Sequence, residues 1–338
     1  MNKTTAETLP ISILTGFLGS GKTTLLNTLL ADPRMGETAV LINEFGDVGL
    51  DHLLVDSIDQ EIVLLDSGCV CCAIQDDFSL SLETLRLKRA QGTIPPFERV
   101  LLETTGIADP APLIQLIATS QTLAPSFHFE KLITVVDAVY GQTTLSAHLE
   151  AVRQVALADH LVLSKTDLGT EADSAALTAR LKALNPAASI LRQASPADFF
   201  GAPTSPESRK HTAEVNTTLL EQHDQRFATY TLSWSNTVDW DDFTDWLNTL
   251  LMARGQSIYR LKGLLNVTGN DRPVVIQGVQ HTFYPPTELS HWPSGTPRTE
   301  LVFITQDFSR TAALNSLKLY FDLPDDDATG PAHQHAYG

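Results

Sequence analysis

One stretch near the N-terminus restricts the fold of this 338-residue chain more than any other. Residues 16–23 read Gly-Phe-Leu-Gly-Ser-Gly-Lys-Thr and match the phosphate-binding P-loop pattern at every fixed position. An apolar run at 11–14 precedes them, and residues 22–30 carry leucines at helical spacing. In a strand–loop–helix unit of this kind, backbone N–H groups surround an anion at the positive end of the helix. We therefore expect the chain to bind a nucleoside triphosphate.

The P-loop pattern also assigns individual roles. Lys22 is expected to reach the β- and γ-phosphates, and the Thr23 hydroxyl is expected to ligate Mg²⁺, so both are candidate catalytic residues. The nucleotide contacts predicted for this segment are Gly16, Gly19, Ser20, Gly21, Lys22, Thr23 and Thr24.

Further apolar runs alternate with segments of helical spacing, and this alternation predicts a doubly wound, mostly parallel α/β sheet. Strands that are buried on both faces read as continuous apolar runs. The predicted strands are residues 38–42, 61–65, 99–102, 132–136, 160–163 and 188–191, and the predicted helices are 77–90, 110–119 and 172–184.

Two segments at predicted strand ends carry carboxylates suited to Mg²⁺. Residues 43–51 contain Glu44 and Asp47 and resemble a nucleotide switch, although a solvated loop is the alternative. Glu103 ends another strand, and its carboxylate is expected beside Mg²⁺ or its water, with the Gly106 N–H beside the γ-phosphate. The hydrolytic water is assigned to Glu103 or to a switch acid, and Asp47 is a catalytic candidate for this reason.

A further strand end carries Ser164-Lys165-Thr166-Asp167, which resembles the Asn-Lys-x-Asp guanine motif. A carboxylate at Asp167 can accept from both N1–H and the exocyclic amine of guanine. Such charge-assisted hydrogen bonds contribute about 1.5–3 kcal/mol each, so they favour GTP over ATP. Ser164 departs from the pattern, because the usual Asn side chain braces the loop. A plain turn after the strand is the alternative.

The three cysteines of the chain, Cys69, Cys71 and Cys72, follow the predicted strand at 61–65. Thiolates are soft ligands that select Zn²⁺ and similar ions, and near neighbours of this kind would form a strained disulfide. A redox thiol pair and plain packing are the alternatives. Three thiolates leave a tetrahedral site incomplete. Glu44, Asp47, a histidine or a second copy of the chain in a homodimer must supply the rest.

The composition excludes several classes of partner. Acidic residues outnumber basic ones by 40 to 23, so the electrostatic field of the protein is expected to repel nucleic acid and anionic lipid. There is no apolar run near 18 residues and no signal-peptide pattern, so a membrane span is not expected. Clustered cysteines without a disulfide framework favour a reducing compartment, and we predict a cytoplasmic protein.

The second half of the chain differs in pattern. Residues 196–208 are rich in Pro, Ser, Gly and Ala, and we predict a first domain at 1–200, a linker at 201–225 and a second domain at 226–322. The second domain is predicted to be a small α+β module without a catalytic constellation. Arg260 and Lys262 are interpreted as charges of a solvated edge strand, with phosphate or partner contact as the alternative. The acidic tail at 323–338, with His333 and His335, is expected to be disordered.

Taken together, these motifs resemble the CobW family of P-loop GTPases. The resemblance rests on the P-loop, Asn-Glu-Phe-Gly at 43–46, Gly-Cys-Val-Cys-Cys at 68–72, Glu-Thr-Thr-Gly at 103–106 and the guanine motif. It continues into the second domain at Arg-Leu-Lys-Gly, residues 260–263. One departure is Ile42, where some members carry a Glu.

The resemblance implies a GTPase metallochaperone that binds Zn²⁺, or Co²⁺, and delivers it to a client metalloprotein. It also implies GTP and Mg²⁺ as cofactors, Cys69, Cys71 and Cys72 as metal ligands, and slow turnover that metal or client stimulates. A GTP-dependent thiol switch that docks partners is the alternative from another class. A small-molecule kinase is disfavoured by Asp167.

Overall fold

The computed structural model describes residues 8–42, 62–64, 73–200, 227–293, 295–321 and 323, with the backbone alone at 62–64 and 73–77. The chain divides into two compact units, residues 1–178 with 188–202 and residues 179–187 with 203–338. Several residues singled out above lie outside the described ranges: Glu44, Asp47, Cys69, Cys71, Cys72, His333, His335 and the linker at 201–225.

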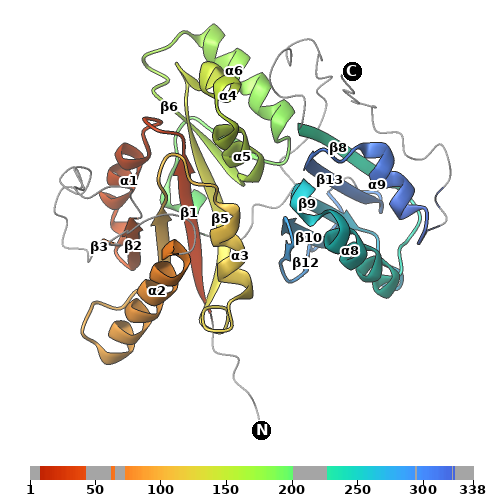
Figure 1. Ribbon diagram of the computed structural model, residues 1–338, viewed down its shortest axis with the longest axis horizontal. Coiled ribbons are helices and arrows are strands. Elements are labelled where there is room, and N and C mark those ends of the chain that lie inside the picture. Colours follow the sequence, from red (N-terminus) through yellow and green to blue (C-terminus); the bar gives the residue numbers. More distant parts are fainter. Residues whose placement is uncertain are drawn as a thin grey trace. The chain divides into compact units, whose positions relative to one another are not determined.

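Within the described residues, the first unit is built on a seven-stranded sheet in the order β3-β2-β4-β1-β5-β6-β7 (Figure 1). Every neighbouring pair is parallel, so the predicted parallel α/β fold is confirmed. The strands are β1 (Leu9–Gly16), β2 (Thr38–Ile42), β3 (Ile62–Leu64), β4 (Arg99–Glu103), β5 (Phe127–Asp137), β6 (His160–Ser164) and β7 (Ser189–Leu191).

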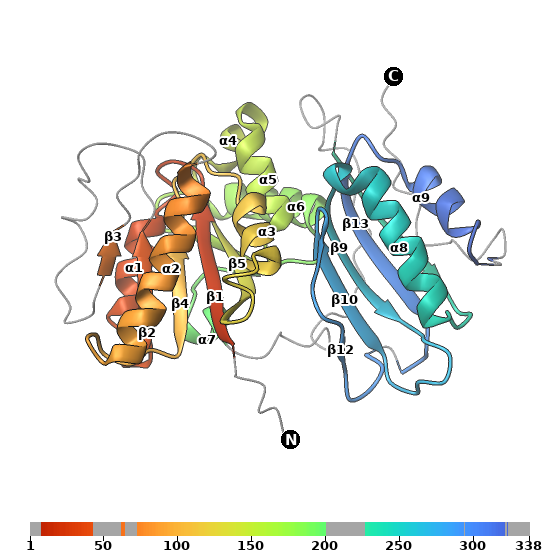
Figure 2. The ribbon, with the colours of Figure 1, turned by 60° about the horizontal axis from the view of Figure 1, so that its bottom comes forward.

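Helices cover both faces of this sheet. Crossovers between parallel strands are right-handed, so connections that run toward β3 and toward β7 lie on opposite faces. This rule assigns α1 to one face and α2, α3, α5 and α6 to the other (Figures 1 and 2). The helices are α1 (Lys22–Leu30), α2 (Ala73–Gln91), α3 (Ala111–Thr119), α4 (Gly141–Ala147), α5 (Leu149–Leu157), α6 (Glu171–Leu184) and α7 (Pro196–Phe199), with a 3₁₀ turn at Pro33–Met35.

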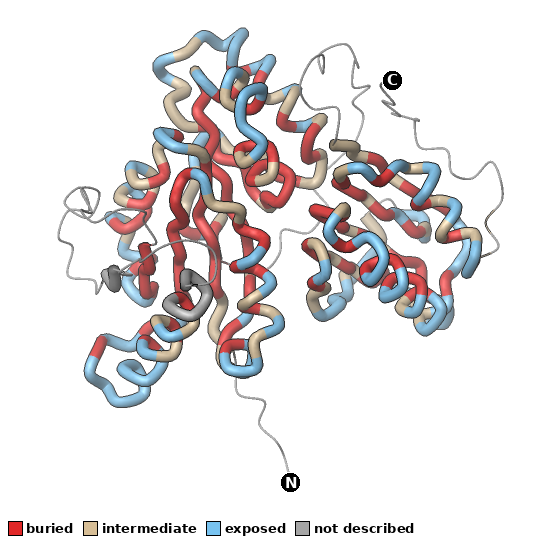
Figure 3. Tube along the Cα trace, in the orientation of Figure 1, coloured by how far each residue is buried: buried red, intermediate tan, exposed pale blue. Residues whose placement is uncertain are grey.

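The sheet face that α1 covers forms a hydrophobic core, which also includes residues near the C-terminal end of the first unit. Leu26 and Leu29 of α1 cluster with Phe199 of α7 and with strand residues that are almost fully buried (Figure 3). The hydroxyl of Ser12 in β1 donates to the carbonyl oxygen of Phe199 at 2.6 Å. The Pro- and Ser-rich stretch from Pro196 therefore begins with a helix packed on this core, inside the predicted first domain.

The sequence pattern assigns no element between Asp137 and His160, yet α4 and α5 occupy this segment. Two neighbouring parallel strands need a crossover of a dozen or more residues, which is usually helical. That topological requirement was available from the sequence, and applying it to the strands on either side would have predicted a helix here.

The second unit contains an antiparallel sheet in the order β11-β10-β9-β13-β8, with β12 paired to β10, as expected for an α+β module. Its core lies between this sheet and two helices. The elements are β8 (Phe227–Trp234), α8 (Trp240–Arg254), a 3₁₀ turn (Gly255–Ser257), β9 (Ile258–Leu265), β10 (Val274–Val279), β11 (Thr282–Phe283), β12 (Thr287–Glu288), β13 (Thr299–Gln306) and α9 (Arg310–Leu317).

The interpretation of Arg260 and Lys262 as charges of an edge strand is wrong. Their strand, β9, lies between β10 and β13, and Arg260 is only 1% exposed. Strand order depends on pairing between distant segments, which a residue pattern does not encode. Among the described residues, no helix is both long enough and apolar enough to cross a membrane.

Candidate functional site

The P-loop connects the end of β1 to the start of α1. Gly19 and Gly21 have φ values of 69° and 93°, in the left-handed region that favours glycine. Lys22 is buried, and its Nζ donates to the carbonyl oxygen of Gly16 at 2.9 Å and to that of Phe17 at 3.3 Å. The ammonium group therefore lies against the loop backbone, where the motif predicts phosphate.

Thr23 and Glu103 meet at the mouth of the loop. They are far apart in the sequence, but β4 pairs with β1 in parallel, so Glu103 at the end of β4 lies beside the loop that follows β1. The Thr23 hydroxyl donates to Glu103 Oε1 at 3.2 Å, and Glu103 is 5% exposed. A hydroxyl and a carboxylate oxygen are hard donors that suit Mg²⁺. The predicted pair thus fits this ion in chemistry and in place.

The segment after β4 lies directly against the P-loop. The Thr104 hydroxyl donates to that of Thr15 at 2.8 Å, and the Thr104 N–H donates to the carbonyl oxygen of Leu14 at 3.0 Å. A Cβ added at Gly106 would lie 2.6 Å from the backbone nitrogen of Leu18. Only glycine fits this approach, so the residue type at 106 is fixed by the P-loop backbone.

Ser164 braces the P-loop despite its departure from the guanine pattern. Its hydroxyl donates to the carbonyl oxygen of Ser20 at 2.6 Å, and the carbonyl oxygen of Val136 lies at 3.4 Å. Ser164 lies 144 residues after Ser20 in the sequence, and this bond links the guanine motif to the phosphate loop. Asp167 is exposed on the turn that follows β6.

Lys165 forms a second link between the same loops. Its Nζ donates to the carbonyl oxygen of Gly19 at 2.7 Å and to Asp137 Oδ2 at 2.7 Å. The other oxygen of Asp137 accepts from the N–H groups of Val139 at 2.8 Å and Tyr140 at 3.0 Å. Burial raises the pKa of Asp137, but these hydrogen bonds outweigh it, so the pKa lies below its ordinary value of 3.8. The carboxylate is therefore ionised at neutral pH and holds the lysine in place.

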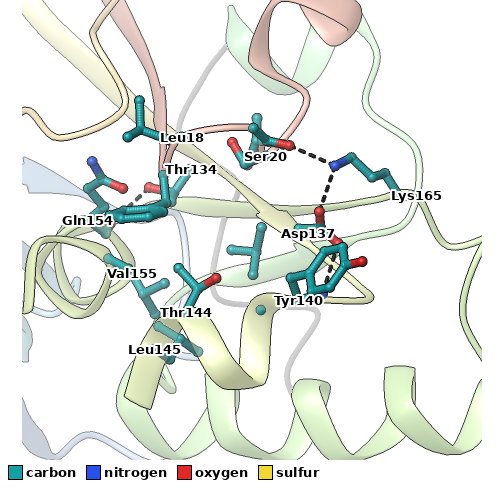
Figure 4. A pocket seen from close by; sticks show the side chains of 16 residues that line it. Leu18, Ser20, Thr134, Asp137, Tyr140, Thr144, Leu145, Gln154, Val155 and Lys165 are labelled. Carbon is teal, nitrogen blue, oxygen red and sulfur yellow. Dashed lines mark hydrogen bonds and ion pairs between the residues drawn. The ribbon is translucent and has the colours of Figure 1, made fainter. Parts of the chain in front are cut away.

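A cavity of about 240 Å³ lies beside these contacts (Figure 4). The figure shows Lys165 between the P-loop and Asp137, with Tyr140 below and Gln154 on the opposite side. Residues of the P-loop, the end of β5, α4 and α5 line it. The segment α4–α5, which the sequence pattern did not predict, therefore forms one wall of the cavity beside the P-loop.

Three residues of this neighbourhood were not among the predicted site residues. Asp137 carries a signal that sequence reasoning could have used, since it is an acid at the end of an apolar strand. His148 stacks on Phe17 of the P-loop, with ring centroids 4.4 Å apart, and Gln154 lies buried in α5. The positions of His148 and Gln154 depend on the path of α4–α5, and neither residue belongs to a sequence motif that could have indicated it.

The predicted metal residues are not placed by the structure. Cys69, Cys71, Cys72, Glu44 and Asp47 all fall outside the described residues. Within the part of the chain that is described, no group of three His, Cys, Asp or Glu residues could hold a metal ion.

Comparison with known families identifies the chain. The profile described as "CobW/HypB/UreG, nucleotide-binding domain" matches residues 10–192. The chain belongs to the CobW/HypB/UreG family. The profile of the "Cobalamin synthesis protein cobW C-terminal domain" matches residues 227–319. The resemblance drawn from the motifs is thus confirmed, and the chain is a P-loop GTPase.

Individual members of the family are similar over different shares of the chain. The zinc chaperone YjiA of Escherichia coli is 29% identical over 301 residues, covering 88% of this chain and 93% of that protein. The zinc-regulated GTPase metalloprotein activator 1 of Schizosaccharomyces pombe is 36% identical over 171 residues, which span 48% of this chain and 40% of the relative.

A solved structure supports the fold. The crystal structure of Zn(II)-bound YjiA GTPase from E. coli superposes with a TM-score of 0.73 at 24% identity, over 93% of this chain and 99% of that chain. At this identity the match establishes the arrangement of helices and strands.

Proposed function

We propose that this GTPase is a metallochaperone that binds Zn²⁺ at Cys69, Cys71 and Cys72 and releases it to a client metalloprotein under control of the bound nucleotide. Relatives named as zinc chaperones and as a zinc-regulated metalloprotein activator support the general role. Co²⁺ is the second candidate ion, because thiolate and carboxylate ligands accept it as well.

One observation carries the coupling between nucleotide and metal. Ile42, the last residue of β2, is the register partner of both Leu64 in β3 and Glu103 in β4. The chain that leads to Glu44 and Asp47 begins after Ile42, and the chain that leads to the cysteines begins after Leu64. The first segment therefore starts on the strand next to the carboxylate that contacts Thr23, and the second starts one strand further away. A change at the nucleotide can reach the two segments across one and two strand spacings.

In this proposal the nucleotide half of the site works by positioning and charge. Lys22 stabilises the charge that develops on the transferring phosphoryl group, and Ser164, Lys165 and Asp167 hold the guanine end. Thr23 and Glu103 hold Mg²⁺, which supplies neutralising charge at the phosphates when bound. The remaining contacts to phosphate come from Gly16, Gly19, Ser20, Gly21 and Thr24, and the N–H of Gly106 meets the γ-phosphate.

The hydrolytic water is positioned by Glu103 or by a switch acid, Asp47 or Glu44. The same two switch acids are the candidates to complete the metal site beside the thiolates, and a second copy of the chain in a homodimer is the alternative source of a ligand. Turnover is proposed to be slow until metal or client binds, as befits a switch.

The test is a Zn²⁺ titration against a chromophoric chelator, with GTP, with GDP and without nucleotide. The wild type should bind Zn²⁺ tightly and with an affinity that depends on the nucleotide. Replacing Cys71 and Cys72 with Ala should abolish tight binding while GTP affinity persists. Unchanged Zn²⁺ affinity in this variant would refute the metal assignment.

The same preparation separates metal delivery from a thiol switch. A redox switch predicts loss of partner binding on exposure to peroxide and indifference to chelators, together with negligible GTP turnover. A metallochaperone predicts that apo-client activation requires the loaded protein and stops when a chelator outcompetes the cysteines.

A further inference from the structure

Gln154 occupies an unusual position for a polar residue. It lies in α5 and is 0% exposed, although burying an amide without hydrogen bonds is costly. Its Nε2 donates to the carbonyl oxygens of Gly106 at 3.1 Å and Ala108 at 3.0 Å. Both acceptors belong to the loop that follows Glu103. A single buried side chain thus holds two peptide groups of this loop.

Other contacts connect the same part of the chain to the same loop. Arg153, the preceding residue, pairs with Asp109 at 3.6 Å. His148, just before α5, stacks on Phe17. The α5 segment therefore contacts the Glu103–Gly106 loop and the P-loop at once. Among these contacts, that of Gln154 is the one made to Gly106 itself.

The geometry at Gly106 shows why a holding group matters there. Its Cα lies so close to the backbone of Leu18 that no Cβ fits. A glycine gains close approach to the P-loop, but its backbone is freer to rotate than that of any other residue. Donation from Gln154 to the Gly106 carbonyl removes this freedom from one adjoining peptide group, and donation to Ala108 fixes the chain two residues later.

We propose that Gln154 is a positioning residue for GTP hydrolysis, which orients the Gly106 backbone toward the γ-phosphate without touching the nucleotide. This inference rests on the assignment of Gly106 to the γ-phosphate proposed above and is independent of the metal assignment. It predicts an effect on the hydrolysis step, where the γ-phosphate is present, and little effect on binding of GDP, which lacks it.

The test compares Gln154→Leu with Gln115→Leu, the same substitution at an exposed position of α3. Single-turnover hydrolysis of Mg²⁺-GTP, affinity for fluorescent GDP and the melting temperature are measured for each. Gln154→Leu should slow hydrolysis by roughly ten- to a hundredfold, the scale of two lost neutral hydrogen bonds. Its GDP affinity should match that of the control.

A second variant separates positioning from packing. Gln154→Glu keeps the shape of the side chain but places a carboxylate against two carbonyl oxygens. Only its protonated form can donate a hydrogen bond. Its hydrolysis rate, relative to wild type at the same pH, should therefore rise as the pH falls. A purely structural role predicts no such recovery.

Three results would count against the inference. Hydrolysis by Gln154→Leu at the rate of the control, with Gly106→Ala inactive, would overturn it and leave the role of Gly106 intact. Normal hydrolysis by Gly106→Ala would refute the γ-phosphate assignment and the inference with it. A parallel loss of GDP affinity and hydrolysis in both Gln154 variants, with a flat pH profile for Gln154→Glu, would assign Gln154 to packing alone.

Discussion

The hydrogen bond from Ser164 to the P-loop gives a sharp test of how this chain binds a nucleotide. Ser164→Ala removes a 2.6 Å bond to the carbonyl oxygen of Ser20 and leaves that oxygen without the hydroxyl. A lost bond of this kind, with an acceptor left partly buried, costs about 1–2 kcal/mol. The bond joins two loops rather than two core elements. We therefore expect most of the cost to appear in nucleotide affinity, which falls by at most about 5- to 30-fold.

The bond is present without nucleotide, so the cost is divided between folding and binding. The variant populates P-loop arrangements that bind less well, and the apparent affinity falls with the fraction that remains competent. Fluorescent GDP titration and urea unfolding together measure both parts. Ser146→Ala is the matched control, because Ser146 also donates to a backbone carbonyl, at 3.0 Å, but is exposed on α4.

The outcome is decisive in either direction. Ser164→Asn restores the usual guanine pattern and a donor, and should recover part of the affinity that alanine loses. If Ser164→Ala matches Ser146→Ala in both GDP affinity and free energy of unfolding, the hydroxyl is not a brace. The departure from Asn would then be a real weakening of the motif.

Three further predictions concern single side chains. Asp167→Ala should erase the preference for GTP over ATP in competition binding, and a retained preference would show that the guanine motif is misplaced. Asp239 accepts from the N–H groups of Asp241 at 2.9 Å and Asp242 at 3.2 Å at the start of α8, so Asp239→Ala should lower the free energy of unfolding by about 1 kcal/mol without changing GTP hydrolysis. Because the folded-state pKa of Asp137 lies below 3.8, its contribution to stability is complete above that pH and is lost as the pH falls through the folded value. The difference in unfolding free energy between wild type and Asp137→Asn should thus shrink below pH 3.8, and a constant difference would contradict the ion pair.

Much of the fold could be predicted because the pattern is local. The P-loop predicted the start of α1 at Lys22, since a phosphate loop requires a helix after it, whereas β1 extends two residues beyond each end of the strand predicted at 11–14. The apolar run at residues 38–42 predicted strand β2 to the residue, because it is a short buried run between polar breaks. Sequence patterns specify such elements without reference to their neighbours.

The site was predicted in part for the same reason. Motifs assigned Lys22, Thr23, Glu103 and Gly106. The structure brings these residues together at the carboxyl ends of β1 and β4. The brace at Ser164 was underestimated, because its acceptor is a backbone carbonyl in a distant loop and a motif compares side chains only. The metal ligands Cys69, Cys71 and Cys72 stay a prediction.

The sequence by itself determined the family and the reaction class, since a P-loop, a guanine motif and a cysteine cluster are short, contiguous patterns with a chemical reason for every fixed residue. Only the tertiary structure decided which residues support them. Asp137 anchors Lys165, and Gln154 holds Gly106, because chain segments far apart in sequence pack side by side. Arg260 is buried for the same reason, since strand order comes from long-range pairing. Contacts of this kind depend on where the backbone goes, and that is fixed by the packing of the whole unit.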